Sequence, residues 1–113
     1  MTIEHYSFGS ITIDGRTYTS DVIIYPDRVN ATWWRKEGHN LNIVDLTDVL
    51  NAKPDVLLVG TGSSGLMKVP KETLSYLESK GIKVHVSLTA QSVDLFNKLQ
   101  SEKKVIAAFH LTC

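Results

Sequence analysis

The feature that most restricts the fold of this chain is a continuous apolar run, Val56 to Val59, followed directly by the glycine-rich segment 60–65. Short β-branched runs without alternating polar positions are typical of strands buried on both faces. Two more strands are expected, over 82–87 and 105–111, and helical patterns separate the three. The order strand-helix-strand-helix-strand predicts an α/β fold with a mainly parallel sheet and a right-handed crossover between the first pair of strands.

The first of the two intervening helices begins at Pro70, whose missing N–H would be unpaired in a first turn anyway. Leu74 and Leu77 give this helix an apolar stripe, and Gly81 ends it. Apolar and polar residues alternate along 82–87, which favours an edge position for that strand.

The second helix is expected to begin with Thr89 as its N-cap residue, and a shorter helix over 46–52 is expected to be capped by Asp45. Both residues carry a side-chain oxygen that can accept a hydrogen bond from a free N–H of the first turn. Apolar residues recur every three positions along the second helix, at Val93, Phe96 and Leu99.

The first quarter of the chain predicts an N-terminal β-hairpin. Apolar and polar residues alternate over 7–13, Asp14-Gly15 is a type I′ turn signal, and a second strand is expected over 17–25. A short further strand is expected over 31–34. The hairpin either extends the sheet or folds over it, and without linkers or repeats residues 1–113 are expected to form a single α/β domain.

Composition excludes several classes of function. The 12 Lys and Arg residues balance 12 Asp and Glu residues, so the chain lacks the basic excess of nucleic-acid-binding proteins. The lone Cys113 cannot form an internal disulfide, which indicates a reducing compartment. The first residues lack a signal-peptide pattern, and no apolar run approaches the ~20 residues that cross a bilayer. We therefore expect a soluble cytoplasmic protein with neither a nucleic-acid nor a membrane partner.

The segment Gly60-Thr61-Gly62-Ser63-Ser64-Gly65 matches the Gly-x-Gly-x-x-Gly pattern of dinucleotide-binding sites. Two other requirements of such a site are not met, because residues 66–69 precede the helix and the next strand ends in Ser87, not in an acid. Lys68 also stands too far from Gly65 for a phosphate-binding P-loop. Two interpretations remain: a tight turn that needs positive φ, or a weak anion site formed by the N–H groups of Thr61 to Gly65. No cofactor is expected.

The histidines and the cysteine offer little evidence of a reactive site. His5, His39, His85 and His110 show no ligand-like spacing, so no metal site is expected. His110 is either a hydrogen-bonded histidine at the core or its rim, or an acid or base acting with Cys113 as nucleophile. Residues at i and i+3 of a strand point to opposite faces, so this pair would need a bend near Leu111.

The most unusual cluster is Trp33-Trp34-Arg35, with His39 close behind. Adjacent indoles on an extended segment face opposite sides, so one is expected to be exposed or interfacial. Arg35 can bind a carboxylate or phosphate through two hydrogen bonds, which makes this loop the first candidate for a ligand or partner contact. The alternative is structural, with Trp34 covering the end of the sheet and Arg35 paired to an acid.

The order of several of these motifs along the chain resembles that in a small domain family of unknown function. This family includes the adipogenesis-associated domain protein and a mitochondrial assembly factor for respiratory complex I. The resemblance spans nearly the whole chain and rests on Trp34-Arg35, Gly38, Val59-Gly60-Thr61-Gly62, Lys68-Val69-Pro70, Gly81-Ile82 and the ending Phe109-His110-Leu111-Thr112-Cys113. It implies a three-layer α/β fold with a mixed sheet of about five strands, and it leaves the direction of the last strand open. The resemblance brings no established enzymatic activity, and we expect this chain to lack the targeting extension of the mitochondrial relative.

Two functions remain in competition. The first is a small binding or assembly module that is not an enzyme and whose partner is a protein. The second is an enzyme that binds a small molecule or anion on the glycine loop and uses His110 and Cys113. The candidate contact residues for either function are Trp33, Trp34, Arg35, His39, Gly60, Thr61, Gly62, Lys68, His110 and Cys113.

Overall fold

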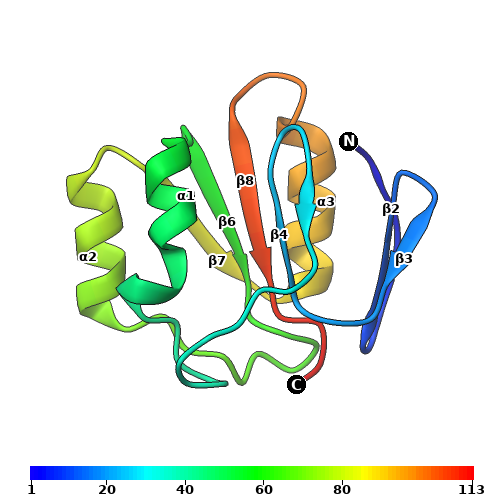
Figure 1. The fold of residues 1–113 in the computed structure, drawn as a ribbon, viewed down its shortest axis with the longest axis horizontal. Helices are drawn as coiled ribbons and strands as arrows, with labels where there is room; N and C mark the ends of the chain where they lie inside the picture. Colours follow the sequence, from blue (N-terminus) through cyan, green and yellow to red (C-terminus); the bar gives the residue numbers. More distant parts are fainter.

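In the computed structural model, which describes all residues 1–113, eight strands and four helical segments follow one another along the chain. Their order agrees with the strand-helix alternation expected in the second half of the sequence (Figure 1). The elements are β1 (Ile3–Ser7), β2 (Ser10–Ile13), β3 (Arg16–Tyr18), β4 (Val22–Ile24), β5 (Val29–Asn30), the 3₁₀ helix η1 (Ile43–Leu46), α1 (Thr47–Ala52), β6 (Val56–Gly60), α2 (Lys71–Ser79), β7 (Lys83–Ser87), α3 (Thr89–Leu99) and β8 (Val105–Phe109).

The main sheet has five strands in the order β5-β4-β8-β6-β7. Strand β6 is parallel to both β7 and β8, whereas β4 is antiparallel to β8 and to β5. The sheet is therefore mixed, as the resemblance implied, and the last strand, β8, is parallel to β6 and lies at the centre of the sheet. Strand β7 lies at the edge, as its alternating sequence predicted.

Both faces of this sheet are covered, which explains the unbroken apolar runs in β4, β6 and β8. On one face the strands pack against α3 and the small N-terminal sheet, and on the other against η1, α1 and α2 (Figure 1). Alternate residues of each strand enter the two cores, so that Leu58 belongs to the first core and Leu57 to the second. The result is the expected three-layer α/β arrangement.

The N-terminal strands form a separate three-stranded sheet, β1-β2-β3, at the side of the molecule next to α3 (Figure 1). Its second turn is the predicted one: Asp14 and Gly15 have φ of 49° and 79°, as a type I′ turn requires. The single strand expected over 17–25 was wrong, because this segment divides into β3 and β4 in different sheets. The apolar residues 22–24 need burial on both faces and pair with β8, while the polar residues of β3 stay at the surface.

Three further local predictions were wrong. Residues 31–34 form no strand, since β5 is restricted to Val29–Asn30. Asp45 lies inside η1, where its carboxylate accepts hydrogen bonds from the N–H groups of Asn42 and Lys36 at 2.8 and 2.9 Å. Thr89 is the first residue of α3 and does not cap it, because its hydroxyl bonds to two loops.

Candidate functional site

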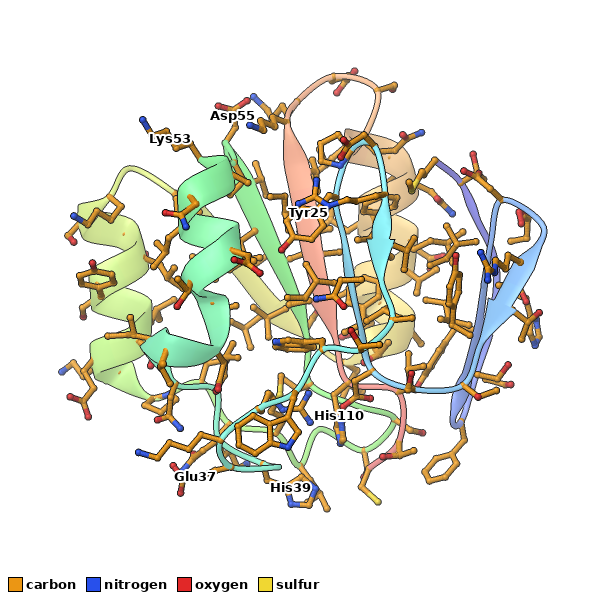
Figure 2. The ribbon with its side chains drawn as sticks, viewed as in Figure 1. Tyr25, Glu37, His39, Lys53, Asp55 and His110 are labelled. Carbon is orange, nitrogen blue, oxygen red and sulfur yellow. The ribbon has the colours of Figure 1, made fainter.

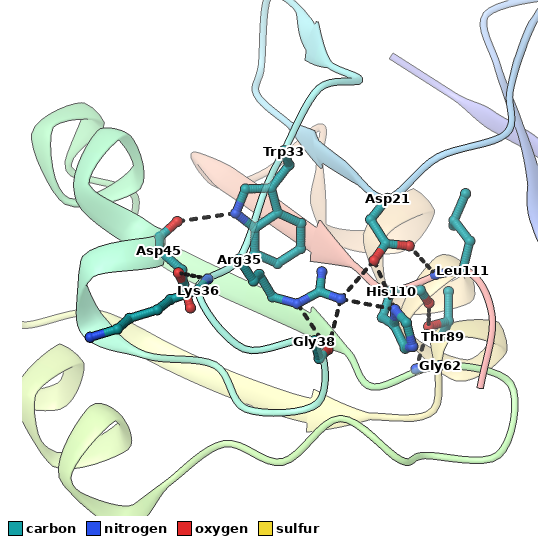
Figure 3. Close-up of polar contacts among 10 residues, drawn as sticks. All are labelled: Asp21, Trp33, Arg35, Lys36, Gly38, Asp45, Gly62, Thr89, His110 and Leu111. Atoms are coloured by element: carbon teal, nitrogen blue, oxygen red, sulfur yellow. Dashed lines mark hydrogen bonds and ion pairs between the residues drawn. The ribbon is translucent and has the colours of Figure 1, made fainter.

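The candidate site lies at the end of the main sheet where strands β6 and β8 finish and strand β4 begins. Antiparallel pairing sets Val22 opposite Phe109, so the residues next to them, Asp21 and His110, become neighbours. The loop before η1 brings Arg35 to the same corner (Figure 3). Segments far apart in the chain thus meet at one end of the sheet.

Asp21 connects the members of this cluster through both oxygens of its carboxylate. Oδ2 lies 2.8 Å from Nη2 of Arg35 and 2.8 Å from Nδ1 of His110, and Oδ1 accepts a hydrogen bond from the N–H of Leu111 at 2.8 Å (Figure 3). The side chains of Arg35 and His110 are only 6% and 7% exposed. Charged and polar groups so far from water require partners, and Asp21 supplies them.

The pKa of Asp21 reflects two opposing effects. Burial of the carboxyl group raises its pKa, but hydrogen bonds from His110, from the N–H of Leu111 and from Arg35 outweigh burial and lower the pKa from 3.8 to about 2. The carboxylate is therefore ionised near neutral pH and can only accept hydrogen bonds. This fixes the proton of the adjacent imidazole on Nδ1, the nitrogen that donates to Asp21.

The other nitrogen of His110, Nε2, is buried and has no hydrogen-bond partner. The backbone of the same residue is fully used: its N–H donates to the carbonyl of Gly60 at 2.9 Å, and its carbonyl accepts from the hydroxyl of Thr89 at 2.6 Å. The ring of His39 lies edge-on to it with centroids 5.6 Å apart. His110 is therefore held rigidly, with one ring nitrogen, Nε2, that has no partner.

Arg35 is held from three sides. Its guanidinium donates to Asp21 and, through Nε and Nη2, to the carbonyl of Gly38 at 3.2 and 2.9 Å. It also lies over the ring of Trp33, 4.8 Å from the centroid, and the indole N–H of Trp33 donates to the carbonyl of Asp45 at 3.1 Å. The predicted pairing of Arg35 with an acid is therefore present, but Trp33, and not Trp34, is the packed indole.

The glycine loop closes the other side of the corner. Gly62 has φ of 109°, and a Cβ on it would lie 2.4 Å from the carbonyl carbon of Cys113 and 2.8 Å from Cδ2 of His110. Gly60 has no positive φ, but a Cβ there would lie 2.7 Å from the hydroxyl oxygen of Thr89. Both glycines thus allow close approach of neighbouring segments, and Gly62 also needs its left-handed conformation.

The N–H groups of this loop are mostly occupied within the protein. Those of Thr61, Gly62 and Ser63 donate to the carbonyl of Ser87, the hydroxyl of Thr89 and the carbonyl of Thr112 at 2.9, 2.9 and 2.6 Å. Ser64 and Gly65 alone are left to offer N–H groups to an anion. The anion site that was expected over Thr61 to Gly65 is therefore reduced to the N–H groups of two residues.

The remaining candidate residues lie around this corner. The side chain of Lys68 makes no hydrogen bond or ion pair with it, but the N–H of Lys68 donates to the carbonyl of His39 at 2.8 Å, which ties the two loops together. Cys113 contacts the glycine loop through its backbone: its carbonyl accepts a hydrogen bond from the N–H of Leu66 at 2.9 Å. Trp34 is largely open to solvent, with 77% of the residue exposed.

Chemically, a histidine oriented by a carboxylate is the arrangement of a general base. A base also requires room for a substrate, and the two surface clefts of this structure are lined by neither Asp21, Arg35 nor His110. Arg35, His110 and the glycine loop thus converge without enclosing a cavity. The cluster ties three segments together and positions the loop that carries Trp34.

Sequence reasoning missed two members of the cluster, Asp21 and Thr89 in its bridging role. A signal for Asp21 was present, because a carboxylate directly before the buried run 22–25 must find a partner, and Arg35 needed an acid. Pairing β4 against β8 in the correct register would have been required to connect them.

Comparison with known proteins agrees with this architecture. A domain family described as "Protein of unknown function (DUF498/DUF598)" matches residues 3–110. The chain belongs to this family. Two curated relatives of the DUF498/DUF598 chain are named NADH dehydrogenase [ubiquinone] 1 alpha subcomplex assembly factor 3, from Xenopus tropicalis and Danio rerio, each 29% identical over 96% and 94% of this chain. The chain spans 59% and 61% of their lengths.

Solved structures share the fold of the DUF498/DUF598 chain. The conserved hypothetical protein PH1505 from Pyrococcus horikoshii OT3 is 31% identical, with a TM-score of 0.86 and full coverage of both chains. A protein titled MT938 is 26% identical, with a TM-score of 0.82 over 99% of this chain and 98% of its own.

None of the helices in the structure of the DUF498/DUF598 chain has the length and apolar character needed to cross a membrane.

Proposed function

We propose that this chain is a non-enzymatic binding and assembly module that recognises a partner protein. The observation that carries the proposal is the exposed Trp34, which stands between two anchored residues. Trp33 is bonded to Asp45, and Arg35 is bonded to Asp21. An aromatic side chain on a rigid segment loses little conformational entropy on binding, and tryptophan is enriched among residues that dominate interface energies.

The names of the two vertebrate relatives support a protein partner, since both are called assembly factors of NADH dehydrogenase. Because this chain spans about three fifths of their length, the partner itself is part of the proposal. A subunit of an NADH dehydrogenase is the first partner to test. We place the chain in a reducing compartment such as the cytoplasm, on the ground of the free thiol of Cys113.

Photo-crosslinking in intact cells tests this surface directly. A benzophenone amino acid would replace Trp34 in one variant and Phe8 in a control variant, since Phe8 is 64% exposed on the β1–β2 turn. We expect one discrete protein adduct from position 34 and none of the same mass from position 8. Identical adduct patterns, or no adduct at position 34, would contradict the proposed surface.

A second candidate function, an enzyme acting on a small molecule or anion, is favoured by one observation: Nε2 of His110 is oriented by Asp21 and has no partner. Such an enzyme must expose this atom to its substrate. Diethyl pyrocarbonate labelling followed by mass spectrometry separates the two functions, because a binding module should protect His110 while the exposed His5 and His39 react. Modification of His110 at the rate of His39 would favour the enzyme.

A further inference from the structure

A cleft of about 600 Å³ opens between the η1–α1 segment and α2, on the face of the main sheet opposite α3. It shares no lining residue with the cluster around Asp21. Its volume falls within the range of roughly 300–1,000 Å³ that holds small molecules in proteins. The two helices that form its walls lie side by side in Figure 1.

Three apolar side chains of the lining form what we call the floor of this cleft. Ile43, Leu50 and Ile82 line it, and Ile82 is 5% exposed because it also belongs to the core beneath α2. Val44 and Tyr76 also line the cleft and are 62% and 37% exposed. Apolar surface left open to water beside a cavity of this size indicates a place for an apolar group.

The charges that line the cleft are all positive. Lys53 and Lys80 take part in the lining, no acidic residue does, and neither lysine belongs to an ion pair of the structure. Nζ of Lys80 lies 5.3 Å from the ring centroid of Tyr76. A ligand that reaches both lysines would therefore meet uncompensated positive charge next to an aromatic ring.

The two lysines lie at the same end of the cleft. Lys53 directly follows α1 and Lys80 directly follows α2, and both helices end at the same side of the molecule (Figures 1 and 2). Lys53 has φ of 51°, which non-glycine residues adopt rarely. The cleft thus has a charged end and an apolar remainder.

We propose that this cleft binds a small amphipathic anion, namely a carboxylate carried by an apolar chain or ring. The carboxylate lies between Lys53 and Lys80, and the apolar part covers Ile43, Leu50 and Ile82. Charge complementarity selects the anion, and the apolar floor selects the length and shape of its body. This site does not include Trp34, so a test of the site is independent of a test of the proposed partner protein.

Titration with octanoate, followed by backbone amide shifts in NMR spectra, tests the site. We expect shifts confined to residues 43–54 and 76–82. Affinity should rise from hexanoate to octanoate to decanoate, by up to about fourfold for each methylene buried. Neutral octanol should bind more weakly than octanoate, because it cannot use the lysines.

Variants separate the charged end from the apolar floor. The double variant Lys53→Gln, Lys80→Gln should weaken octanoate binding by roughly fivefold or more and leave octanol binding unchanged. Lys98→Gln, an exposed lysine on α3, is the matched control and should leave both unchanged. Lys53 and Lys80 follow helix C-termini, where positive charge is stabilising, so their replacement could also lower stability. A second variant, Val44→Asp, therefore places a charge beside the apolar part of the bound ligand, at an exposed position where folding is not at risk.

Several results would overturn the proposal. Octanoate shifts outside these two ranges, or equal octanoate affinity of the native chain and Val44→Asp, would remove the site. An acidic amphipathic peptide that shifts the same residues while no fatty acid does would assign the cleft to a protein ligand instead. Concentration-dependent dimerisation in sedimentation experiments, abolished by Val44→Asp, would assign it to a second copy of the chain.

Discussion

Asp21 and His110 stand 89 positions apart in the sequence, yet Oδ2 of Asp21 lies 2.8 Å from Nδ1 of His110. The same oxygen lies 2.8 Å from Nη2 of Arg35, so one carboxylate joins the start of β4, the end of β8 and the loop before η1. The guanidinium of Arg35 is too deeply buried for water to replace this partner. The stability of the corner, and with it the position of the Trp34 loop, should depend on Asp21.

Asp21→Asn should lower the free energy of unfolding by about 3 kcal/mol, because it leaves the buried charge of Arg35 without a counter-charge. Urea denaturation measures this loss. Asp27→Asn is the matched control, since it breaks an ion pair with Arg28 whose side chains are 75% and 59% exposed. The control should change stability by less than about 0.5 kcal/mol, and equal losses in the two variants would contradict a structural role for the cluster.

Acid should weaken the same corner. The pKa of Asp21 is about 2 in the folded chain against 3.8 for an ordinary aspartate, so the unfolded chain takes up this proton more readily. The stabilisation is therefore fully present above about pH 4 and is lost as the pH falls toward 2. The difference in urea midpoint between the native chain and Asp21→Asn should be smaller at about pH 3 than at about pH 6. The same difference at both pH values would contradict the lowered pKa of Asp21.

Gly62→Ala should be far more damaging than Gly81→Ala. Both glycines have positive φ, at 109° and 79°, but a Cβ on Gly62 meets the backbone of Cys113 while one on Gly81 meets nothing within 4 Å. We expect about 1 kcal/mol for Gly81→Ala, and more than about 3 kcal/mol or no folded protein for Gly62→Ala. Thermal melts of the purified variants compare them, and similar melting temperatures would show that the corner can expand.

The two adjacent tryptophans should differ in their contribution to stability. Trp33→Ala removes a half-buried indole together with its hydrogen bond to Asp45 and its contact with Arg35, and should cost about 2 kcal/mol. Trp34→Ala removes an exposed side chain and should cost less than about 0.5 kcal/mol. Chemical denaturation of both variants would reveal any reversal of this order.

Cys113→Ser should change stability by less than about 1 kcal/mol. The contacts that hold Cys113 use its carbonyl oxygen, which accepts from the N–H of Leu66 and the hydroxyl of Ser64 at 2.9 Å each, and serine keeps that carbonyl. Soluble yield and melting temperature would check this. A collapse of either would mean that the thiol packs more tightly than its partial exposure indicates.

Much of the fold followed from local sequence patterns. The run Val56–Val59 predicted a strand buried on both faces, the alternation in 82–87 predicted an edge strand, and Asp14-Gly15 predicted a turn that needs two positive φ angles. These features depend on neighbours in sequence. The division of 17–25 between two sheets depended instead on β8, which lies more than 80 positions away.

The cluster was harder to predict for the same reason. Arg35 and His110 were noticed as residue types, but their shared partner Asp21 is an ordinary acid in a turn-like segment until β4 pairs with β8. The sequence around Thr89 predicted a helix cap, but its hydroxyl instead accepts a hydrogen bond from the N–H of Gly62 and donates one to the carbonyl of His110. Here tertiary hydrogen bonds replace the local one that the sequence predicted.

The segment that follows β8 is hydrogen-bonded to the first strands of the domain. The carbonyl of Leu111 accepts from the N–H of Gly9 at 2.8 Å and from the hydroxyl of Tyr6 at 3.0 Å, while its N–H donates to Asp21. On the ribosome, Asp21 and Arg35 emerge long before His110 and Leu111, so their charges remain hydrated until β8 has left the exit tunnel. The corner can therefore close only after β8 and Leu111 have been made, so folding of this part of the domain depends on contacts between residues far apart in the sequence.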